Sequence, residues 1–365
     1  MLPPLSLVLL LSAQAWAMGG ALPDCPVPEA ITVTQDTRLE PACRYRTSIH
    51  ITASGVELDC RGAQIDARGL DWGILIGGRQ PVSQVTVRNC HVRGGGNGIR
   101  VARLEPDGVK AKRHDRETLY RITPHHIVLE NVSVRDSQRV GIYLDDYVSQ
   151  VRIADSHVSG SGSSGIYLEH SSRKNEILNT TVTGNGHGSF PRYRFGSGLR
   201  EGIAIDSSAH NRLVGNRIFD NAAGGIFLYK NCQEHINTNP QSVPRWQHAD
   251  HNLIQGNTIE DEKVGVWIAS RQSRDLSSWD CGDPPYLAPG HFPDHASHNQ
   301  VRGNRFVDVA VGVRVEDDDN TIVGNTFVST PIPFEKGAKL RQQTLGTPLQ
   351  GIVFEGNTLS PAPGN

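Results

Sequence analysis

The feature that most constrains the fold of this chain is a repeat of two short motifs that alternate along it. One motif is glycine followed by an apolar, a variable and an apolar residue, and it begins at Gly73, Gly98, Gly141, Gly165, Gly202, Gly225, Gly265 and Gly312. The other places an asparagine after an apolar run, at Asn216, Asn257, Asn304, Asn325 and Asn357. Apolar residues two positions apart lie on one face of a β-strand. A repeat of this kind indicates a repetitive architecture.

The spacing of the glycine motif defines the repeating unit. The shortest intervals are close to 24 residues, and longer intervals contain extra residues. Such a unit has room for three short strands and three turns, and no segment shows a sustained helical period. Three strands form one coil of a parallel β-helix, in which coils about 4.8 Å apart bury their inward side chains against one another. We therefore predict an all-β, single-domain right-handed parallel β-helix with three sheets, about ten coils, an N-terminal cap and long insertion loops.

The two ends of the chain differ from the repeats. The apolar run LPPLSLVLLLSAQAWA, with small residues at Ala15 and Ala17, is typical of a signal peptide over 1–17, cleaved after Ala17. We expect an N-terminal cap over 18–49, the β-helix over 50–359 and a tail over 360–365. The apolar run is shorter than the roughly 20 residues that span a membrane. The sequence thus predicts a periplasmic or secreted protein without membrane insertion.

Six cysteines follow the predicted cleavage site, and an even number in an exported protein favours disulfides. Cys25 with Cys43 is the pair we expect first. Cys60 and Cys90 fall at similar places in adjacent coils, so they form either a bridge or stacked thiols. Two insertions contain the remaining pair, Cys232 and Cys281, which could join these loops.

Charge narrows the class of partner. The formal net charge is -2, so the chain has no basic excess to bind a nucleic-acid backbone.

Three insertions follow a glycine-motif strand, at about 103–125, 229–250 and 269–297, and a fourth, about 184–200, precedes one. Long loops on a rigid scaffold usually carry binding residues. Loops on both flanks of one sheet make walls, so we expect a groove for a linear polymer.

Strand parity predicts which side chains face this groove. Four aromatic residues, Tyr143, Tyr167, Phe227 and Trp267, share one outward column. Exposed aromatic side chains in a row favour stacking on sugar rings, whereas the alternative is that a loop packs over them.

The next outward column contains Asp145, Glu169 and Asp206. Carboxylates at steps of about 4.8 Å repel one another unless a cation lies among them. They could bind Ca²⁺, act as acid and base in glycoside hydrolysis, or form an ordinary solvated face. Further candidates surround them: Tyr229 and Lys230 on the next coil, His187, Arg192, Arg194 and Arg200 on the fourth insertion, and Arg271 on another.

The coil motif, the LDCRGAQI segment and the asparagine turns resemble right-handed parallel β-helix, pectate-lyase-like carbohydrate-active proteins over about 50–359. That group includes polysaccharide lyases, mannuronan C5-epimerases, polygalacturonase-like hydrolases and periplasmic repeat proteins. The Asp-Pro-His-Asp motif of the epimerases is absent, as are the Asn-Thr-Asp and Arg-Ile-Lys signatures of the hydrolases. Carboxylates beside a lysine and an arginine look most like the lyases that use Ca²⁺ to neutralise a uronate.

The resemblance implies an exported lyase or C5-epimerase that removes the C5 proton of an anionic linear polyuronate. Lys230 would be the base, with Tyr229 or His187 as substitutes and Arg200 nearby. The metal ligands would be Asp145, Glu169 and Asp206, and the substrate would contact the four aromatic residues with Arg192, Arg194 and Arg271. The alternatives are a metal-independent glycoside hydrolase and a non-catalytic β-helix protein that binds or exports polysaccharide.

Overall fold

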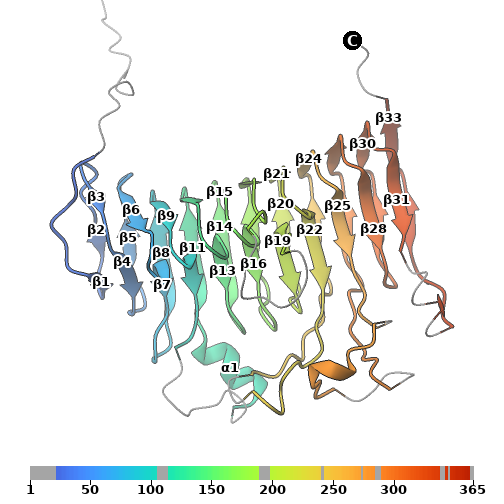
Figure 1. Cartoon of the computed structure of the whole chain (residues 1–365), viewed down its shortest axis with the longest axis horizontal. Helices are drawn as coiled ribbons and strands as arrows, with labels where there is room; N and C mark the ends of the chain where they lie inside the picture. Colours follow the sequence, from blue (N-terminus) through green and yellow to red (C-terminus); the bar gives the residue numbers. More distant parts are fainter. Residues whose placement is uncertain are drawn as a thin grey trace, which may run out of the picture.

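The computed structural model describes residues 22–104, 114–188, 198–239, 242–272, 274–283, 289–337, 342–343 and 346–361. Over this part of the chain, three parallel sheets run side by side, each with 11 strands (Figure 1). The chain visits the sheets in turn, which gives the coils of a solenoid. The predicted three-sheet β-helix is confirmed, with 11 coils where about ten were expected.

The glycine motifs all lie in one sheet, which we call the floor sheet. Its strands are β1 (Ala30–Val33), β4 (Ser48–Ile51), β7 (Trp72–Ile76), β10 (Asn97–Val101), β13 (Ile142–Leu144), β16 (Ile166–Leu168), β19 (Glu201–Asp206), β22 (Gly224–Tyr229), β25 (Val264–Ile268), β28 (Val311–Val315) and β31 (Ile332–Lys336).

The second and third sheets complete each coil. The second sheet contains β2 (Thr37–Arg38), β5 (Glu57–Asp59), β8 (Ser83–Arg88), β11 (His125–Glu130), β14 (Ser149–Ala154), β17 (Glu176–Leu178), β20 (Arg212–Val214), β23 (Leu253–Gln255), β26 (Gln300–Arg302), β29 (Thr321–Val323) and β32 (Val353–Glu355). The third contains β3 (Arg44–Tyr45), β6 (Gln64–Ala67), β9 (His91–Gly94), β12 (Ser133–Arg135), β15 (His157–Ser159), β18 (Thr181–Thr183), β21 (Arg217–Phe219), β24 (Thr258–Glu260), β27 (Arg305–Val307), β30 (Thr326–Val328) and β33 (Thr358–Ser360).

The core is built by the alternation that the motif predicts. The inward residues of the floor sheet are fully buried: Ile142, Leu144, Ile166, Leu168, Ile203, Ile205, Ile226 and Leu228. Adjacent coils are in register, so each inward side chain packs on the equivalent residue of the next coil. Burial of this continuous apolar column is the main stabilising contribution that stacking supplies.

The motif glycines are needed because neighbouring coils approach closely. A Cβ added to Gly141 would lie 2.6 Å from the carbonyl oxygen of Gly165 and 2.4 Å from a methyl group of Val158. None of the eight motif glycines adopts the left-handed backbone conformation, so the close approach of the coils, and not a tight corner, is what requires glycine here.

The repeated asparagines form a buried ladder. Asn216 donates to the side-chain oxygen of Asn257 at 2.9 Å, Asn257 to Asn304 at 2.9 Å, and Asn304 to Asn325 at 3.0 Å. Each amide also donates to a backbone carbonyl of the preceding coil, so these buried polar groups are satisfied. Their role is structural.

The first coil begins earlier than the boundary at residue 50 suggests. Strands β1, β2 and β3 lie within the segment predicted as a cap and are already the first strands of the three sheets. The disulfide between Cys25 and Cys43 joins the chain ahead of β1 to the turn before β3, as predicted. Two further disulfides, Cys60–Cys90 and Cys232–Cys281, settle the alternatives left open for those cysteines. The predicted signal peptide lies outside the described residues.

The long loops fall where the repeat intervals place them. The connections β10–β11, β22–β23 and β25–β26 leave the floor sheet at the ends of its strands, along its lower edge in Figure 1. They contain α1 (Arg116–Ile122) and the short helix η2 (Ser277–Trp279). The connection β18–β19 enters from the opposite edge.

Two of these loops are packed together. Tyr120 of α1 contacts Tyr147, with ring centroids 5.2 Å apart, and Trp246, at 6.2 Å. The Tyr147 hydroxyl donates to the carbonyl of Pro244 at 2.7 Å. This contact fixes the β22–β23 loop as a wall beside the floor sheet.

Candidate functional site

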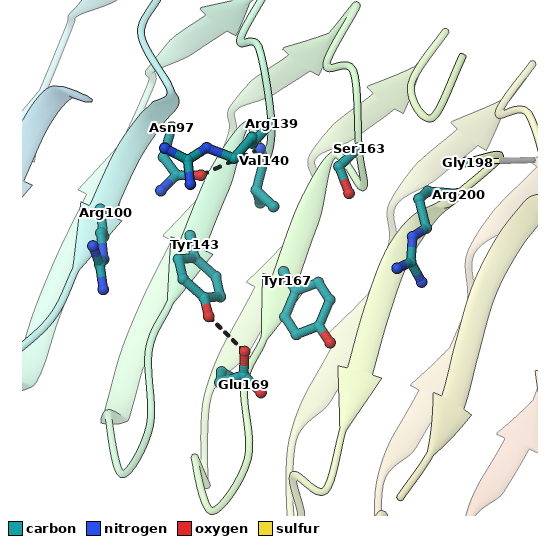
Figure 2. A pocket seen from close by; sticks show the side chains of 10 residues that line it. All are labelled: Asn97, Arg100, Arg139, Val140, Tyr143, Ser163, Tyr167, Glu169, Gly198 and Arg200. Carbon is teal, nitrogen blue, oxygen red and sulfur yellow. Dashed lines mark hydrogen bonds between the residues drawn. The ribbon is translucent and has the colours of Figure 1, made fainter. Parts of the chain in front are cut away.

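A cavity of about 360 Å³ lies over the floor sheet, on the outward side of β10, β13 and β16. Its lining residues are Asn97, Arg100, Arg139, Val140, Tyr143, Ser163, Tyr167, Glu169, Gly198 and Arg200 (Figure 2). The outward parity of the glycine motif explains why Arg100, Tyr143 and Tyr167 point into it. A cavity thus lies over the sheet where the groove was predicted, along this stretch of the solenoid.

Three arginines make the cavity cationic. Arg100 is anchored by an ion pair with Asp145, whose Oδ2 lies 3.0 Å from the arginine Nε. Arg139 and Arg200 form no ion pair with another described side chain, and both are exposed. Guanidinium groups match the geometry of carboxylates, so two free ones favour an anionic ligand.

The floor of the cavity contains a hydrogen-bonded chain of three side chains. The Tyr143 hydroxyl donates to Oε2 of Glu169 at 2.5 Å, and Nδ1 of His170 lies 2.8 Å from Oε1 of the same carboxyl. Figure 2 shows the phenol of Tyr143 directed at Glu169. The buried His170 Nε2 has no hydrogen-bond partner among the residues that the structure describes. These groups form a path along which a proton can move.

A second chain lies beside the first. The Tyr167 hydroxyl donates to Oδ2 of Asp206 at 2.8 Å, and Arg245 of the β22–β23 loop has Nη1 3.7 Å from the same oxygen. The Tyr143 and Tyr167 rings are edge to face, with centroids 5.6 Å apart. Tyr229 of β22 has its hydroxyl 3.3 Å from Oε1 of Glu201. Two phenols with separate carboxylate partners therefore meet in one cavity.

The electrostatic environment sets the protonation states of these groups. Burial, followed by the nearby carboxylates, raises the pKa of Tyr143 and of Tyr167 well above the usual value, so both phenols keep their protons at neutral pH. Burial alone would raise the pKa of Glu169, but the His170 imidazole, Arg245 and the Tyr143 hydrogen bond lower it below its usual range. Glu169 is thus an ionised acceptor.

The three carboxylates predicted as a Ca²⁺ site do not gather around one point. Asp145 pairs with Arg100, Glu169 with Tyr143 and His170, and Asp206 with Tyr167 and Arg245. Within the described ranges, no group of three or more His, Cys, Asp or Glu side chains is arranged to hold a metal ion. The oxygen ligands that Ca²⁺ requires are occupied by other partners, so these residues do not fit the ion.

Lys230 does not lie beside Asp206 in the groove as we expected. It is 2% exposed, and its Nζ is 3.4 Å from Asp294 and 3.9 Å from Asp283, beneath the β25–β26 loop. The physical reason is that Lys230 comes directly after the last residue of β22, outside the strand, and the β25–β26 loop supplies two carboxylates that hold its ammonium group. Its position supports a structural ion pair and gives no support to the predicted role as base.

The other predicted site residues are divided between the cavity and the rest of the molecule. Phe227 is buried against Trp267, with centroids 5.1 Å apart, so neither ring lines the cavity. His187 is exposed, and its Nε2 lies 3.4 Å from the carbonyl oxygen of Asp220. Arg271 stacks over Tyr229 at 5.1 Å. Arg192 and Arg194 lie outside the described residues.

Sequence reasoning missed four residues of the site. Arg100 stood in the outward column but had no assigned role, and Arg139 precedes the glycine motif by two positions, where no pattern marks it. His170 directly follows Glu169, an adjacency that gives a usable signal. Arg245 reaches the site only because its loop docks on α1, which no sequence pattern indicates.

Comparison with known proteins places the fold in a family. A sequence model described as the right handed beta helix region matches residues 72–273, so the chain belongs to this family. Among curated proteins, no sequence matches the chain. No helix in the described part is long and apolar enough to cross a membrane.

Three solved structures are similar to this chain, and for two of them the TM-score exceeds 0.5. A periplasmic alginate epimerase, AlgG, is 14% identical over 91% of this chain and 76% of its own, with a TM-score of 0.56. The catalytic domain of a GH87 α-1,3-glucanase, in complex with tetrasaccharides, is 11% identical over 90% and 62%, with a TM-score of 0.55. The A-module of the Azotobacter vinelandii mannuronan C-5 epimerase AlgE4 is 12% identical over 91% and 86%, with a TM-score of 0.42. At these identities, the similarity shows the fold alone.

Proposed function

We propose that this protein is a carbohydrate-active enzyme that removes the C5 proton of a uronate in an anionic polysaccharide, as a lyase or a C5-epimerase. The observation that carries the proposal is the cavity itself, in which Arg139 and Arg200, without an ion pair to any described side chain, line the same space as Tyr143 and its carboxylate partner, Glu169. The alginate epimerase with the same fold is consistent with this substrate class.

The arginines address the first chemical difficulty. Removal of the C5 proton places a second negative charge on the uronate, so the carboxylate must be neutralised. Arg139 and Arg200 line the cavity, form no ion pair within the described part of the chain, and can bind this carboxylate through charge-assisted hydrogen bonds. They would stabilise the enolate-like transition state more than the ground state.

The two phenols supply proton transfer. In the proposed step, the C5 proton moves to the Tyr143 oxygen while the phenol proton moves to Oε2 of Glu169, which is already its hydrogen-bond acceptor. Tyr167, protonated and on the adjacent strand, is the proton donor. Donation to O4 as the C4–O4 bond breaks gives an unsaturated product. Donation to C5 from the opposite face gives the epimer.

The experiment is a panel of polymannuronate, polyguluronate, polygalacturonate and a neutral glucan, each incubated with and without chelator. Absorbance of the unsaturated uronate reports elimination, proton NMR reports epimerisation, and new reducing ends without that absorbance report hydrolysis. We expect turnover of a polyuronate that chelator does not abolish. Activity on the neutral glucan alone, or hydrolysis without either uronate product, would refute the proposal. Loss of activity in chelator, restored by Ca²⁺, would bring the metal back into the mechanism.

We also propose that the protein is exported after cleavage of the signal peptide at Ala17. The three disulfides support an oxidising compartment. Intact-mass and N-terminal analysis of the protein from periplasmic and culture fractions tests this, and an uncleaved protein with reduced cysteines in the cytoplasm would contradict it.

A further inference from the structure

The cavity occupies a short part of the solenoid. Its lining residues come from β10, β13 and β16, from the turns just before β13 and β16 and just after β16, and from the segment just before β19. No strand before β10 or after β19 contributes one. The volume of about 360 Å³ lies at the low end of the roughly 300–1,000 Å³ of pockets that enclose small ligands. A channel that held an extended polymer would continue across more coils.

The cavity is closed toward the N-terminal end of the solenoid. The outward residue of β7 is Leu75, which pairs in register with Arg100 of β10 and is 0% exposed. The outward column is therefore covered immediately beside the cavity. Arg100 forms the adjoining end, where Asp145 holds its guanidinium group.

The opposite end is closed by packed aromatic rings. Ala204 of β19 is fully buried, and Phe227 of β22 is 7% exposed against Trp267 of β25. These residues belong to one apolar cluster with Val264, Ala269 and Val311. Arg314 of β28 covers Trp267, with its guanidinium carbon 5.4 Å from the ring centroid. In this half of the column that was expected to stack on sugars, Phe227 and Trp267 pack on each other.

The edges of the sheet bound the cavity in the other direction. Glu169 and His170 lie at the ends of the strands beside Arg245, whose Nη2 is 2.6 Å from Oε1 of Glu234. Gly198 and Arg200 line the side where β19 begins. Among the described residues, the cavity lining therefore continues along the floor sheet neither past Leu75 nor past Phe227.

We propose that the cavity binds the terminal sugars of a uronate chain, so the enzyme acts from chain ends or on short oligosaccharides and not at interior positions. This inference rests on the proposed function, because it takes the occupant to be a polyuronate. An interior segment must extend beyond the site on both sides, and Leu75 and Phe227 are buried at the two sides along the solenoid.

A binding experiment tests this without turnover. The Tyr143→Phe variant is titrated by calorimetry with uronate oligosaccharides of increasing length, and with hexamers that carry a bulky group at one end or at both. We expect affinity to stop rising after about three sugars, and blocking of both ends to weaken binding by about tenfold or more. A doubly blocked hexamer that binds as tightly as the free hexamer overturns the inference and leaves the proposed function intact.

Product analysis with the wild-type chain gives the second test. Reducing-end-labelled chains are sampled at low conversion by mass spectrometry, for cleavage, or by NMR, for epimerised sugars. We expect changes confined to one terminus. Changes distributed along the chain overturn the inference alone. Absence of both binding and conversion for every uronate overturns the proposed function, and the inference with it.

A variant of the barrier completes the design. Phe227→Ala with Trp267→Ala removes the packed rings and keeps every lining residue in the sequence, although Tyr167 belongs to the same apolar cluster. We expect the double variant to accept doubly blocked hexamers several-fold better than the wild type. The matched control is Phe306→Leu, a core substitution on β27 distant from the floor sheet's outward face. If the double variant is folded and still requires a free end, these two rings are not the barrier.

Discussion

The two halves of the floor sheet use the same outward positions in different ways. On β13 and β16, Tyr143 and Tyr167 line a cavity and donate to carboxylates. On β22 and β25, Phe227 and Trp267 stand in the same column and pack on each other. Parity is identical in both halves.

The two halves differ because the side chains in the outward column have different neighbours. The tyrosines carry hydroxyl groups that need partners, and Glu169 and Asp206 supply them, each from the coil that follows the coil of its tyrosine. Phe227 and Trp267 have apolar faces that bury each other, together with Val264 and Val311. An outward position on a β-helix is therefore a ligand site only where its neighbours leave space above it.

The largest expected effect comes from the hydroxyl of Tyr143. Tyr143→Phe keeps the ring and removes the donor to Glu169, so the turnover rate on a polyuronate should fall by about 10²–10⁴-fold. Initial rates and the thermal unfolding midpoint measure this. Phe227→Leu, in the same column of the packed half, is the control and should change the rate only slightly. Equal losses in both variants would remove the functional distinction between the halves.

Lys230 distinguishes a structural charge from a catalytic one. Lys230→Ala leaves Asp294 buried without its cation, so the free energy of unfolding should fall by about 3–5 kcal/mol. Urea unfolding measures this, and Lys263→Ala, an exposed lysine, should leave stability nearly unchanged. Rates should be compared at a temperature where the variant is folded. A stable Lys230→Ala protein without turnover would return Lys230 to the mechanism as the base.

Arg200 and Arg314 form a matched pair across the two halves. Arg200→Gln removes an unpaired guanidinium group from the cavity, and the dissociation constant for a uronate trisaccharide should rise by about tenfold or more. Arg314→Gln removes one that is already paired with Glu335 over Trp267 and should leave binding unchanged. Calorimetric titration of both variants checks this. Weaker binding in Arg314→Gln alone would move the ligand site to the packed half.

The smallest effect concerns Glu262, which ends a ladder of side-chain amides just before β25. Its Oε1 accepts from Nδ2 of Asn221 at 2.8 Å, and burial raises its pKa to about 8 from 4.5. Because the folded state binds the proton more tightly, this carboxyl contributes stability below pH 4.5 that is lost as the pH rises to about 8.

Glu262→Gln keeps the acceptor oxygen and removes the titration. The variant should be more stable than the wild type at pH 8.5 by about 1–3 kcal/mol, and the difference should shrink toward pH 5. Urea unfolding of both proteins at pH 8.5 and at pH 5 measures the difference in the free energy of unfolding at each pH. A pH-independent difference would show that the carboxyl is already ionised in the folded protein.

The sequence by itself determined the coil, the direction of each side chain and the places of the loops. The reason is that strand parity and the near-24-residue repeat are local properties, and every coil needs a pair of apolar side chains that point inward. Residues such as Ile166 and Leu168, and the position of the cavity over the floor sheet, follow from them. The disulfide between Cys25 and Cys43 could also be predicted from the sequence, because only two cysteines precede the first clear coil.

Only the tertiary structure decided how the outward charges are partnered. Asp145, Glu169 and Asp206 stand one above another in the sequence pattern, yet Arg100, His170 and Arg245 separate them into three different contacts. Arg245 reaches Asp206 because Trp246 and Tyr120 pack two loops together. Lys230 lies away from the cavity because it pairs with Asp294 of a third loop. Contacts between loops depend on side chains far apart in the chain, and a repeat pattern carries no information about them.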